Sequence, residues 1–363
     1  MTIINEYEEP DERDALKEAR RARVFTAINK SSKYLTVLGL GWVVPVAKIA
    51  AGDSFKEQGR ELWQTFFIPM IGMAFFIGAW ALLAPQVKTS LGTIPGPMQV
   101  IEQVDFLIKD HQREREKEEA FHKRVEVHNL KLIAAGKADK AKPRRYTGKP
   151  TYFDQIITSV KTVAVGFIIA TLIAVPLGIA AGLSRTVTGA LNPLIQIFKP
   201  VSPLAWLPIV TMVVSATYVN TYDGLSKSLV VSAVTVTLCS LWPTLINTTL
   251  GVASIDKELM NVTKVLQLPT WKVITKLVLP SSLPLIFTGM RLSLGVGWMV
   301  LIAAEMLAQN PGLGKFVWDE FQNGSSSSLA KIIVAILTIG LIGFLLDRLM
   351  FALQSAFTFS ANR

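Results

Sequence analysis

Residues 258–291 read ELMNVTKVLQLPTWKVITKLVLPSSLPLIFTGMR. A charged amphipathic helix, a turn at Pro269, a second short helix and the dipeptide Leu279-Pro280 stand here between two long apolar runs. Because both flanking runs are long enough to enter a bilayer, the segment predicts an ordered pair of helices at a membrane surface. The residues alone leave two roles open for this pair, which are contact with lipid and docking of a partner protein.

The composition indicates an all-α polytopic membrane protein with about six transmembrane helices. Half of the 363 residues are hydrophobic, the mean hydropathy is +0.40, and several apolar runs approach the ~20 residues that a spanning helix needs. The net charge of +10 is typical of Lys and Arg at cytoplasmic helix ends beside anionic membrane lipid, and we expect no nucleic-acid partner. The only cysteine, Cys239, lies in an apolar run, so no disulfide framework or thiolate metal site is expected.

Residues 1–65 are predicted to form a cytoplasmic arm followed by an interfacial helix. The polar stretch 1–33 holds seven acidic and seven basic side chains. Residues 34–47 form a run of only fourteen residues that contains Pro45, which favours a helix lying in the interface and leaves a spanning helix as the alternative. The first transmembrane helix is expected within residues 66–85.

Residues 86–158 are predicted to form a long charged extracytoplasmic loop. Its middle, residues 111–122, is almost entirely charged and suits a solvated helix. Residues 134–150 are rich in Lys and Gly and predict a flexible return. All three histidines of the chain, His111, His122 and His128, fall in this loop. Their spacing fits no recognised metal motif, so we expect solvated side chains and no metal site.

Residues 159–363 are predicted to form the membrane core, with a loop at residues 254–283. One element of this core contains four prolines, which forbid a regular helix and favour a kinked segment packed inside protein. The five predicted spans are Thr162–Leu183, the proline-broken Ala190–Ala216, Ser228–Val252, Leu285–Leu307 and Leu329–Phe351.

The orientation follows from the short connections. Arg185, the lysines of residues 254–283 and Arg348 share one side with the N-terminus if there are six spans. The positive-inside rule makes that side cytoplasmic. The loop of residues 86–158 then lies outside, which the rule permits because long loops translocate largely regardless of charge.

With these spans assigned, four motifs resemble those of ATP-binding-cassette (ABC) importer permeases of the nitrate, sulfonate and taurine branch, and above all permeases for nitrate/nitrite. The motifs are KPVSPLAWLP at 199–208, FTGMRL at 287–292, AAEM at 303–306 and GLGKFVWDE at 312–320. The resemblance implies a type I ABC importer permease (MetI-like) fold in the bacterial inner (plasma) membrane. It also implies four kinds of partner: a second copy of the chain, two cytoplasmic ATP-binding subunits, an extracytoplasmic substrate-binding protein and membrane lipid.

The same resemblance implies that the loop at residues 254–283 couples the permease to its ATPases. Where the family motif has a glycine, this chain has Gln267, which predicts a turn that needs no positive φ and is shaped by Pro269 instead. Asp256 is expected to cap the helix, and Leu259, Val262 and Leu266 to pack against the partner. The full set of coupling residues is Glu258, Leu259, Asn261, Val262, Thr263, Lys264, Leu266, Gln267, Leu279 and Pro280.

The sequence contains no phosphate-binding motif of the form GxxxxGK[ST] and no nucleophile–base constellation. We therefore expect a transport subunit without catalytic residues or a cofactor of its own, with ATP and Mg bound by the partner subunits.

Ionisable and hydroxyl residues within the spans are candidates for a translocation path. For Glu305 a structural role is favoured, because a carboxylate repels an anion. Arg291 either extends to lipid headgroups or provides a positive step for the anion. The candidate path residues are Lys199, Thr211, Ser215, Thr235, Asn247, Arg291 and Glu305.

The leading interpretation is an ATP-driven importer of nitrate or nitrite, with bicarbonate, sulfonate and taurine as alternative cargoes. A secondary transporter would show inverted repeats and midplane carboxylates, which the sequence lacks. A membrane scaffold would leave the proline-broken element unexplained.

Overall fold

The computed structural model describes residues 23–29, 32, 35, 39–89, 92–137, 141–218 and 226–360. Residues 1–22 of the predicted arm and part of the predicted interfacial helix, residues 34 and 36–38, lie outside this set. The chain divides into two units, residues 1–80 with 351–356 and residues 81–350 with 357–363, and each is described by itself.

The first unit contains α2 (Val43–Ala50), α3 (Phe55–Leu62) and most of α4 (Ile68–Leu83). A π turn, Trp63–Phe67, joins α3 to α4 without a break, so the continuous helix begins at Phe55, eleven residues before the predicted Phe66, with a polar first part. The helix Phe55–Gln86 is long and apolar enough to cross a membrane. Its side chains are mostly exposed within this chain, as expected of a helix that faces lipid or another subunit.

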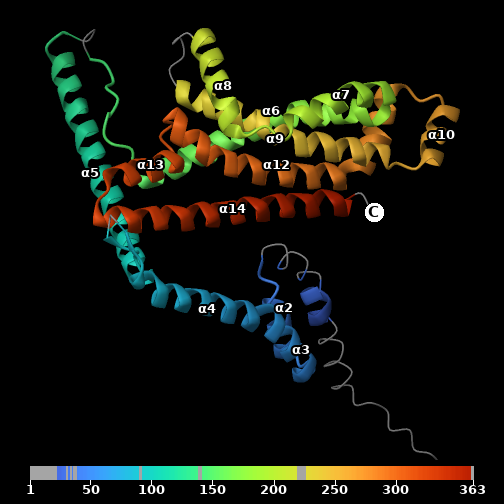
Figure 1. The fold of residues 1–363 in the computed structure, drawn as a ribbon, viewed down its shortest axis with the longest axis horizontal. Helices are drawn as coiled ribbons and strands as arrows, with labels where there is room; N and C mark the ends of the chain where they lie inside the picture. Colours follow the sequence, from blue (N-terminus) through green and yellow to red (C-terminus); the bar gives the residue numbers. More distant parts are fainter. Residues whose placement is uncertain are drawn as a thin grey trace, which may run out of the picture. The chain divides into compact units, whose positions relative to one another are not determined.

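The second unit is a helical bundle with a long helix at one end (Figure 1). A small hairpin of β1 (Lys88–Thr89) and β2 (Gly92–Thr93) precedes the helices. The described helices are α5 (Pro97–Ala134), α6 (Tyr152–Leu183), α7 (Arg185–Phe198), α8 (Pro203–Thr217), α9 (Lys227–Ala253), α10 (Lys257–Val265), α11 (Thr270–Val273), α12 (Leu279–Ala308), α13 (Leu313–Asn323) and α14 (Ser326–Ser360). Among the described residues five helices could span a membrane, or six if the bent pair α7–α8 counts as one span, in agreement with the predicted six.

Small residues let α6 and α9 approach closely. The buried face of α6 carries a residue of small side chain at every fourth position from Thr162 through Gly166, Ala170 and Ala174 to Gly178. A Cβ added at Gly166 would collide with Val236 and the backbone of α9, and one at Gly178 with Thr248. Close backbone approach at small residues is a main source of helix association in lipid.

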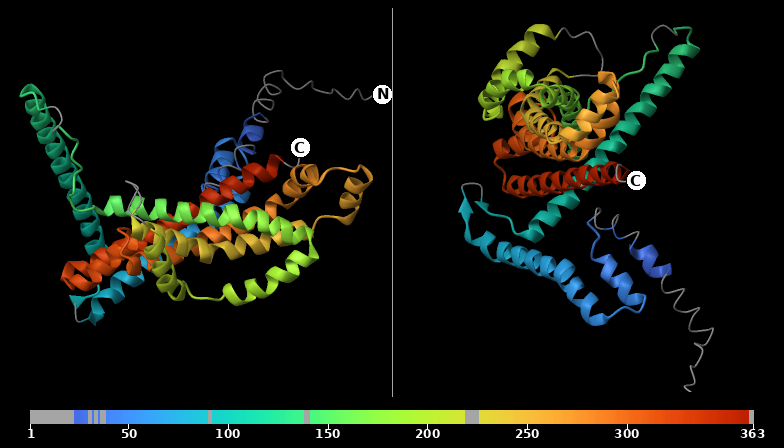
Figure 2. Two further views of the ribbon diagram at one scale, coloured as in Figure 1. Left: turned by 90° about the horizontal axis from the view of Figure 1, so that it is seen from above. Right: turned by 90° about the vertical axis from the view of Figure 1, so that its right-hand side faces the viewer.

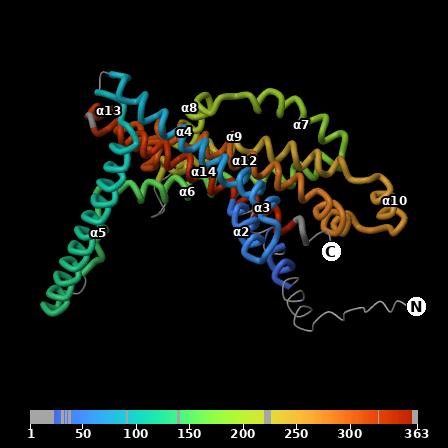
Figure 3. Tube along the Cα trace, turned by 90° about the horizontal axis from the view of Figure 1, so that it is seen from below, coloured from blue at the N-terminus to red at the C-terminus, as the bar shows by residue number. Residues whose placement is uncertain are grey.

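Contacts along the bundle show how its helices run. Gly166, midway along α6, meets Val236 in the first half of α9, and Gly182 meets Val252 near the end of both helices, so α6 and α9 are parallel. Gly251, near the end of α9, meets Ser282, near the start of α12, so α12 runs the opposite way. The hydroxyl oxygens of Thr244 on α9 and Ser293 on α12 are hydrogen-bonded at a distance of 2.7 Å. The loop carrying α10 and the start of α6 therefore lie at opposite ends of the bundle (Figure 3).

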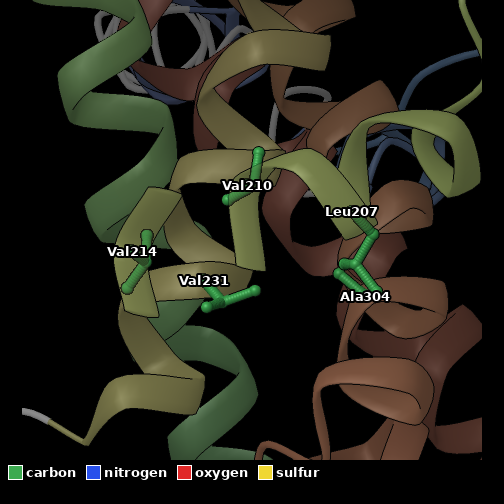
Figure 4. Packing of buried hydrophobic residues seen from close by; sticks show 5 residues of the cluster. All are labelled: Leu207, Val210, Val214, Val231 and Ala304. Carbon is green, nitrogen blue, oxygen red and sulfur yellow. The ribbon is translucent and has the colours of Figure 1, made fainter. Parts of the chain in front are cut away.

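The proline-rich element, α7 and α8, connects the end of α6 to the start of α9 at the other end of the bundle. α7 and α8 meet at 103° and form an arch beside α9 (Figure 2). The break falls between Phe198 and Pro203, whereas Pro193 and Pro208 lie inside the helices. Leu207, Val210 and Val214 of α8 pack on Val231 of α9 and Ala304 of α12 (Figure 4). α7 buries none of its residues within this chain, so the prediction that the whole element packs inside protein is wrong for a single copy.

Prolines also explain two irregular helical turns. A π turn, Ile274–Val278, precedes Leu279-Pro280, just as the turn Trp63–Phe67 precedes Ile68-Pro69. A proline donates no backbone hydrogen bond, and a wider turn accommodates the lost bond without ending the helix. As a result Thr270–Ala308 is one continuous helix. The prediction of a separate short helix before Leu279-Pro280 is corrected by this continuity.

Candidate functional site

The α10 segment, defined as residues 256–269, forms a compact turn of helix beyond the ends of α9 and α12 (Figure 1). It begins as predicted, because the Asp256 carboxylate accepts a hydrogen bond from the Glu258 backbone N–H at 3.0 Å. A carboxylate at this position satisfies an otherwise unpaired N–H and interacts favourably with the helix dipole.

The end of α10 contradicts the prediction about Gln267. This residue has a φ of +48°, in the left-handed region. The Gln267 N–H donates to Lys264 O at 3.0 Å and the Leu268 N–H to Thr263 O at 3.1 Å, which is the bonding pattern of a Schellman motif. These two bonds pair carbonyl groups in the last turn of α10, and they form only if residue 267 is left-handed. The requirement therefore lies in the backbone and does not depend on the side chain at position 267. Pro269 follows the turn and does not replace it.

The α10 segment presents apolar side chains to its surroundings. Leu259 is 48% exposed, Val262 52%, Leu266 61% and Val265 82%. Asn261, Lys264 and Glu258 are also exposed, whereas Thr263 is buried and donates to Met260 O at 2.8 Å. Leu279 and Pro280 are half-buried at the start of α12. The predicted coupling residues therefore divide into an exposed face and a buried anchor, and their coupling role stays a prediction.

The candidate path residues do not gather at one point. Lys199 is exposed where α7 ends, and Ser215 is exposed on α8, with its hydroxyl donating to the Thr211 carbonyl at 2.5 Å. Thr235 is fully buried and donates to Val231 O, and Asn247 donates to Pro243 O, each at 2.8 Å. These hydrogen bonds return to each residue's own helix, as polar side chains in lipid commonly do. A path role for the set stays a prediction.

Arg291 forms a bidentate ion pair across the bundle. Its Nε lies 2.5 Å from Asp347 Oδ1 and its Nη2 2.7 Å from Oδ2. Both side chains are 41% exposed, and the pair joins α12 to α14. Planar two-bond pairing of this kind fixes the geometry as well as the charge, so Arg291 has a structural partner on α14 that the sequence analysis did not identify.

Glu305 lies in a buried cluster at the other end of α12. Its side chain is fully buried, and its carboxylate accepts the Ser159 hydroxyl at 2.8 Å and the Gly314 backbone N–H at 2.9 Å. The Ser159 oxygen in turn accepts the Leu313 N–H at 2.8 Å. We call Ser159, Glu305, Leu313 and Gly314 the Glu305 cluster. Together the two side chains pair the first N–H groups of α13, which otherwise has no side-chain cap.

Glycines make room for this arrangement. A Cβ at Gly312 would overlap the Glu305 carboxylate, and one at Gly314 would overlap the Ile302 carbonyl. An anion at the N-terminus of a helix is favourable because the unpaired N–H groups and the helix dipole both point to it. The tripeptide Gly312-Leu313-Gly314 was the available sequence signal for a close approach of two backbones. Ser159 was missed because 146 residues separate it from Glu305.

The histidines and possible metal ligands give no metal centre in the described residues. His111 Nδ1 lies 2.8 Å from the Thr151 hydroxyl at the start of α6, and His122 and His128 are exposed. No group of three or more His, Cys, Asp or Glu side chains within this part of the chain is arranged to hold a metal ion.

A bundle of five or six apolar helices with an exposed helical segment at one end defines an α-helical, multi-pass membrane protein. The family model for the inner membrane component of binding-protein-dependent transport systems matches residues 174–358. This match covers half of the chain, so the chain belongs to that family and has its MetI-like fold. The fold class, the inner-membrane location and the resemblance expected from the motifs are confirmed.

Relatives with assigned cargoes fall into three groups. A nitrate import permease of Leptolyngbya laminosa is 36% identical over 198 residues, which cover 54% of this chain and 66% of that protein. A bicarbonate transport system permease of Synechococcus elongatus is 31% identical over 304 residues, 82% of this chain and 93% of that protein. The taurine transport system permease of Escherichia coli K12 is 31% identical over 208 residues, 57% and 70% of the two chains. The chain thus spans just under two thirds of that nitrate permease and nearly all of the bicarbonate permease.

The substitution Ser159→Ala tests the Glu305 cluster. It removes a donor to a buried carboxylate and an acceptor for Leu313 N–H, so we expect the free energy of unfolding to fall by about 1–3 kcal/mol. Thermal melting of the purified permease in detergent measures this. Ser215→Ala is the matched control, because that hydroxyl is exposed and bonds only to its own helix. Equal melting temperatures for the two variants would show that the cluster does not hold α13.

Gln267→Gly tests the left-handed turn. Glycine adopts positive φ without the steric penalty of an L side chain, so we expect the free energy of unfolding to rise by about 1 kcal/mol. Gln267→Ala keeps the Cβ and should leave stability nearly unchanged. The same melting measurement compares them, and a Gly variant no more stable than the Ala variant would contradict a positive φ at this position.

Proposed function

We propose that this chain is the transmembrane subunit of an ATP-driven importer that passes a small oxoanion, nitrate or nitrite, to the cytoplasm. The single observation that carries the proposal is the exposed apolar face of the α10 segment, held at one end of a bundle of this family. Exposed apolar residues on an ordered helix need a binding partner. Because the sequence lacks a phosphate-binding motif, the partner is a separate ATPase subunit on the cytoplasmic side.

The continuous helix Thr270–Ala308 supports a mechanical role. This helix begins directly after the α10 segment and ends at the Glu305 cluster. A displacement of α10 would therefore be transmitted along the helix to the opposite end of the bundle. A packed interior moves as discrete rigid elements and does not deform gradually. Closure of two nucleotide-bound ATPase subunits would therefore shift α12 against α6 and α9 and open or close the route for the anion.

A second copy of the chain fits the exposed surface of α7 and α8. Ile197, Leu204, Ile209 and Met212 are each more than half exposed within a single chain. A second copy would cover these side chains and enclose the path between the two bundles. ATP and Mg are then held by the two partner ATPases, and the substrate is delivered by an extracytoplasmic binding protein.

The choice of nitrate or nitrite rests on the resemblance of the motifs. Identity does not separate the cargoes, because nitrate permeases and a bicarbonate permease of Synechocystis sp. match equally, at up to 36%. A specific observation favours bicarbonate as the second candidate. The bicarbonate permease of Synechococcus elongatus aligns over 304 residues, against 198 for the nitrate permease of Leptolyngbya laminosa. Sulfonate and taurine are more distant alternatives that the taurine permease relative supports.

Cysteine cross-linking tests the docking of ATPase subunits. In a Cys239→Ser background, which removes the only native cysteine, single cysteines at Leu259, Val262 and Leu266 should each capture an ATPase subunit, and nucleotide should change the yield. Gln322→Cys is the control, because it is exposed on α13, at the end of the bundle opposite the α10 segment. Capture at Gln322 alone, or at none of the three sites, would refute the proposed coupling surface.

Uptake by proteoliposomes tests the cargo. The permease, its ATPases and its binding protein should accumulate labelled nitrate in the presence of ATP, and unlabelled nitrite should compete more strongly than bicarbonate or taurine. A catalytically inactive ATPase provides the control for passive leak. Uptake of bicarbonate or taurine without nitrate uptake would reassign the cargo while leaving the transport mechanism in place.

A further inference from the structure

The helix α5 and the segment that returns along it form one structural arm. α5 has 38 residues, a length of about 57 Å at 1.5 Å per residue. The Tyr146 hydroxyl donates to Glu114 Oε1 at 2.6 Å, and this bond lowers the pKa of the Glu114 carboxyl. The Tyr146 ring lies 5.4 Å from that of Phe121. Further out, the Asn129 side chain donates to Lys142 O at 3.2 Å. We call residues 97–137 and 141–150 the arm.

The arm is anchored to the membrane bundle at its base. The Arg115 guanidinium lies 2.7 Å from the Asp154 carboxylate of α6, and His111 contacts Thr151, which caps the same helix. Val100 and Leu107 are buried. Bonds to the first turn of α6 hold the arm at the end of the bundle opposite the α10 segment (Figure 2).

Charge is distributed unevenly along the arm. Residues 109–122 contain four basic and five acidic side chains, whereas residues 123–149 contain nine basic and two acidic ones. Acidic side chains near the base are already paired, as in Lys117–Glu114 and Arg115–Glu118. In the distal part the described cations are exposed and make no ion pair with another described residue: Lys123, Arg124, Lys131, Lys137, Lys142, Arg144, Arg145 and Lys149.

The distal part of the arm also has a concave apolar surface. A groove with a volume of about 410 Å³ lies between α5 and the return segment. Its apolar lining is Val125, Leu130, Ile133 and Pro143, and its polar lining is His122, Glu126, Asn129 and Arg144. Leu130 is 60% exposed and Ile133 53%. An apolar centre within a charged rim is the composition of a protein–protein interface. Its concave shape suits a protruding side chain of a partner better than the flat surface of a membrane.

We propose that the distal part of the arm, residues 123–137 and 141–149, is the docking surface for the extracytoplasmic substrate-binding protein, which presents an acidic rim around an apolar protrusion. This inference rests on the proposed function, which places the arm outside the membrane. An unpaired positive surface attracts an acidic partner at long range, and the apolar groove provides the contact once the partner has arrived. The arm would hold the binding protein near the mouth of the anion route.

Binding measurements on full-length permease test this surface. The permease is placed in nanodiscs of phosphatidylcholine, and the probe is the purified substrate-binding protein that supports uptake in the reconstituted system. The triple variant Arg124→Gln, Arg144→Gln, Arg145→Gln should raise the Kd about tenfold at low salt and should reduce the salt dependence of binding. The matched control neutralises three exposed cations near the base, Lys109→Gln, Arg113→Gln and Lys117→Gln, and should leave the Kd nearly unchanged.

A second variant tests the apolar groove. Leu130→Ser with Ile133→Ser should weaken binding to a similar degree at all salt concentrations, because both side chains are exposed and the substitutions do not disturb a core. Equal Kd values for the wild type, the distal variants and the basal variant would overturn the proposal. Loss of binding to phosphatidylglycerol vesicles with unchanged binding of the substrate-binding protein would overturn it too, since the arm would then be a lipid contact. ATPase capture at the α10 segment lies at the other end of the bundle, so it decides the proposed function independently.

Discussion

The close approach of α6 and α9 is the contact on which the rest of the bundle depends. Gly166, Gly178 and Gly182 leave no space for a side chain, so the two backbones pack directly against each other. In lipid the gain from burying apolar surface is small, and dense packing at small residues supplies much of the stability. α12 then closes against this pair through Gly289, which meets the backbone of α9 near Thr244, and through the Thr244–Ser293 hydrogen bond. α7, α8 and α13 each pack on one or more of these three helices.

The α10 segment and the Glu305 cluster lie at the two ends of one continuous helix, Thr270–Ala308. A break at Leu279-Pro280, near the start of the helix Thr270–Ala308, would separate the α10 segment from the core. The π turn before Pro280 keeps the helix continuous, and the carboxylate of Glu305 fixes its far end to α6 and α13. The buried carboxyl group of Glu305 therefore has a structural task, which is to pair the start of α13 where lipid offers no water to do so.

The number of spans, the surface helix of residues 257–265 and the break in the proline-rich element could all be predicted from the sequence, because length, hydropathy and proline content act locally. The left-handed Gln267 could not, because its φ is imposed by two hydrogen bonds to earlier carbonyls and not by its side chain. Ser159 and Asp347 were missed for another reason. Their partners Glu305 and Arg291 lie far away in the sequence, and only the packed bundle brings them together. The small residues at every fourth position of α6 were a readable signal of close helix packing that the hydropathy analysis did not use.

The parallel arrangement of α6 and α9 has a consequence for biogenesis. Two parallel neighbours cannot be joined by a short turn, so α7 and α8 must be synthesised and must recross the bilayer before α9 exists. During that interval the glycine face of α6 has no partner of its own chain and remains in contact with lipid. The close α6–α9 interface therefore assembles after insertion, and substitutions on this face are expected to act on nascent-chain survival before they affect any finished transporter.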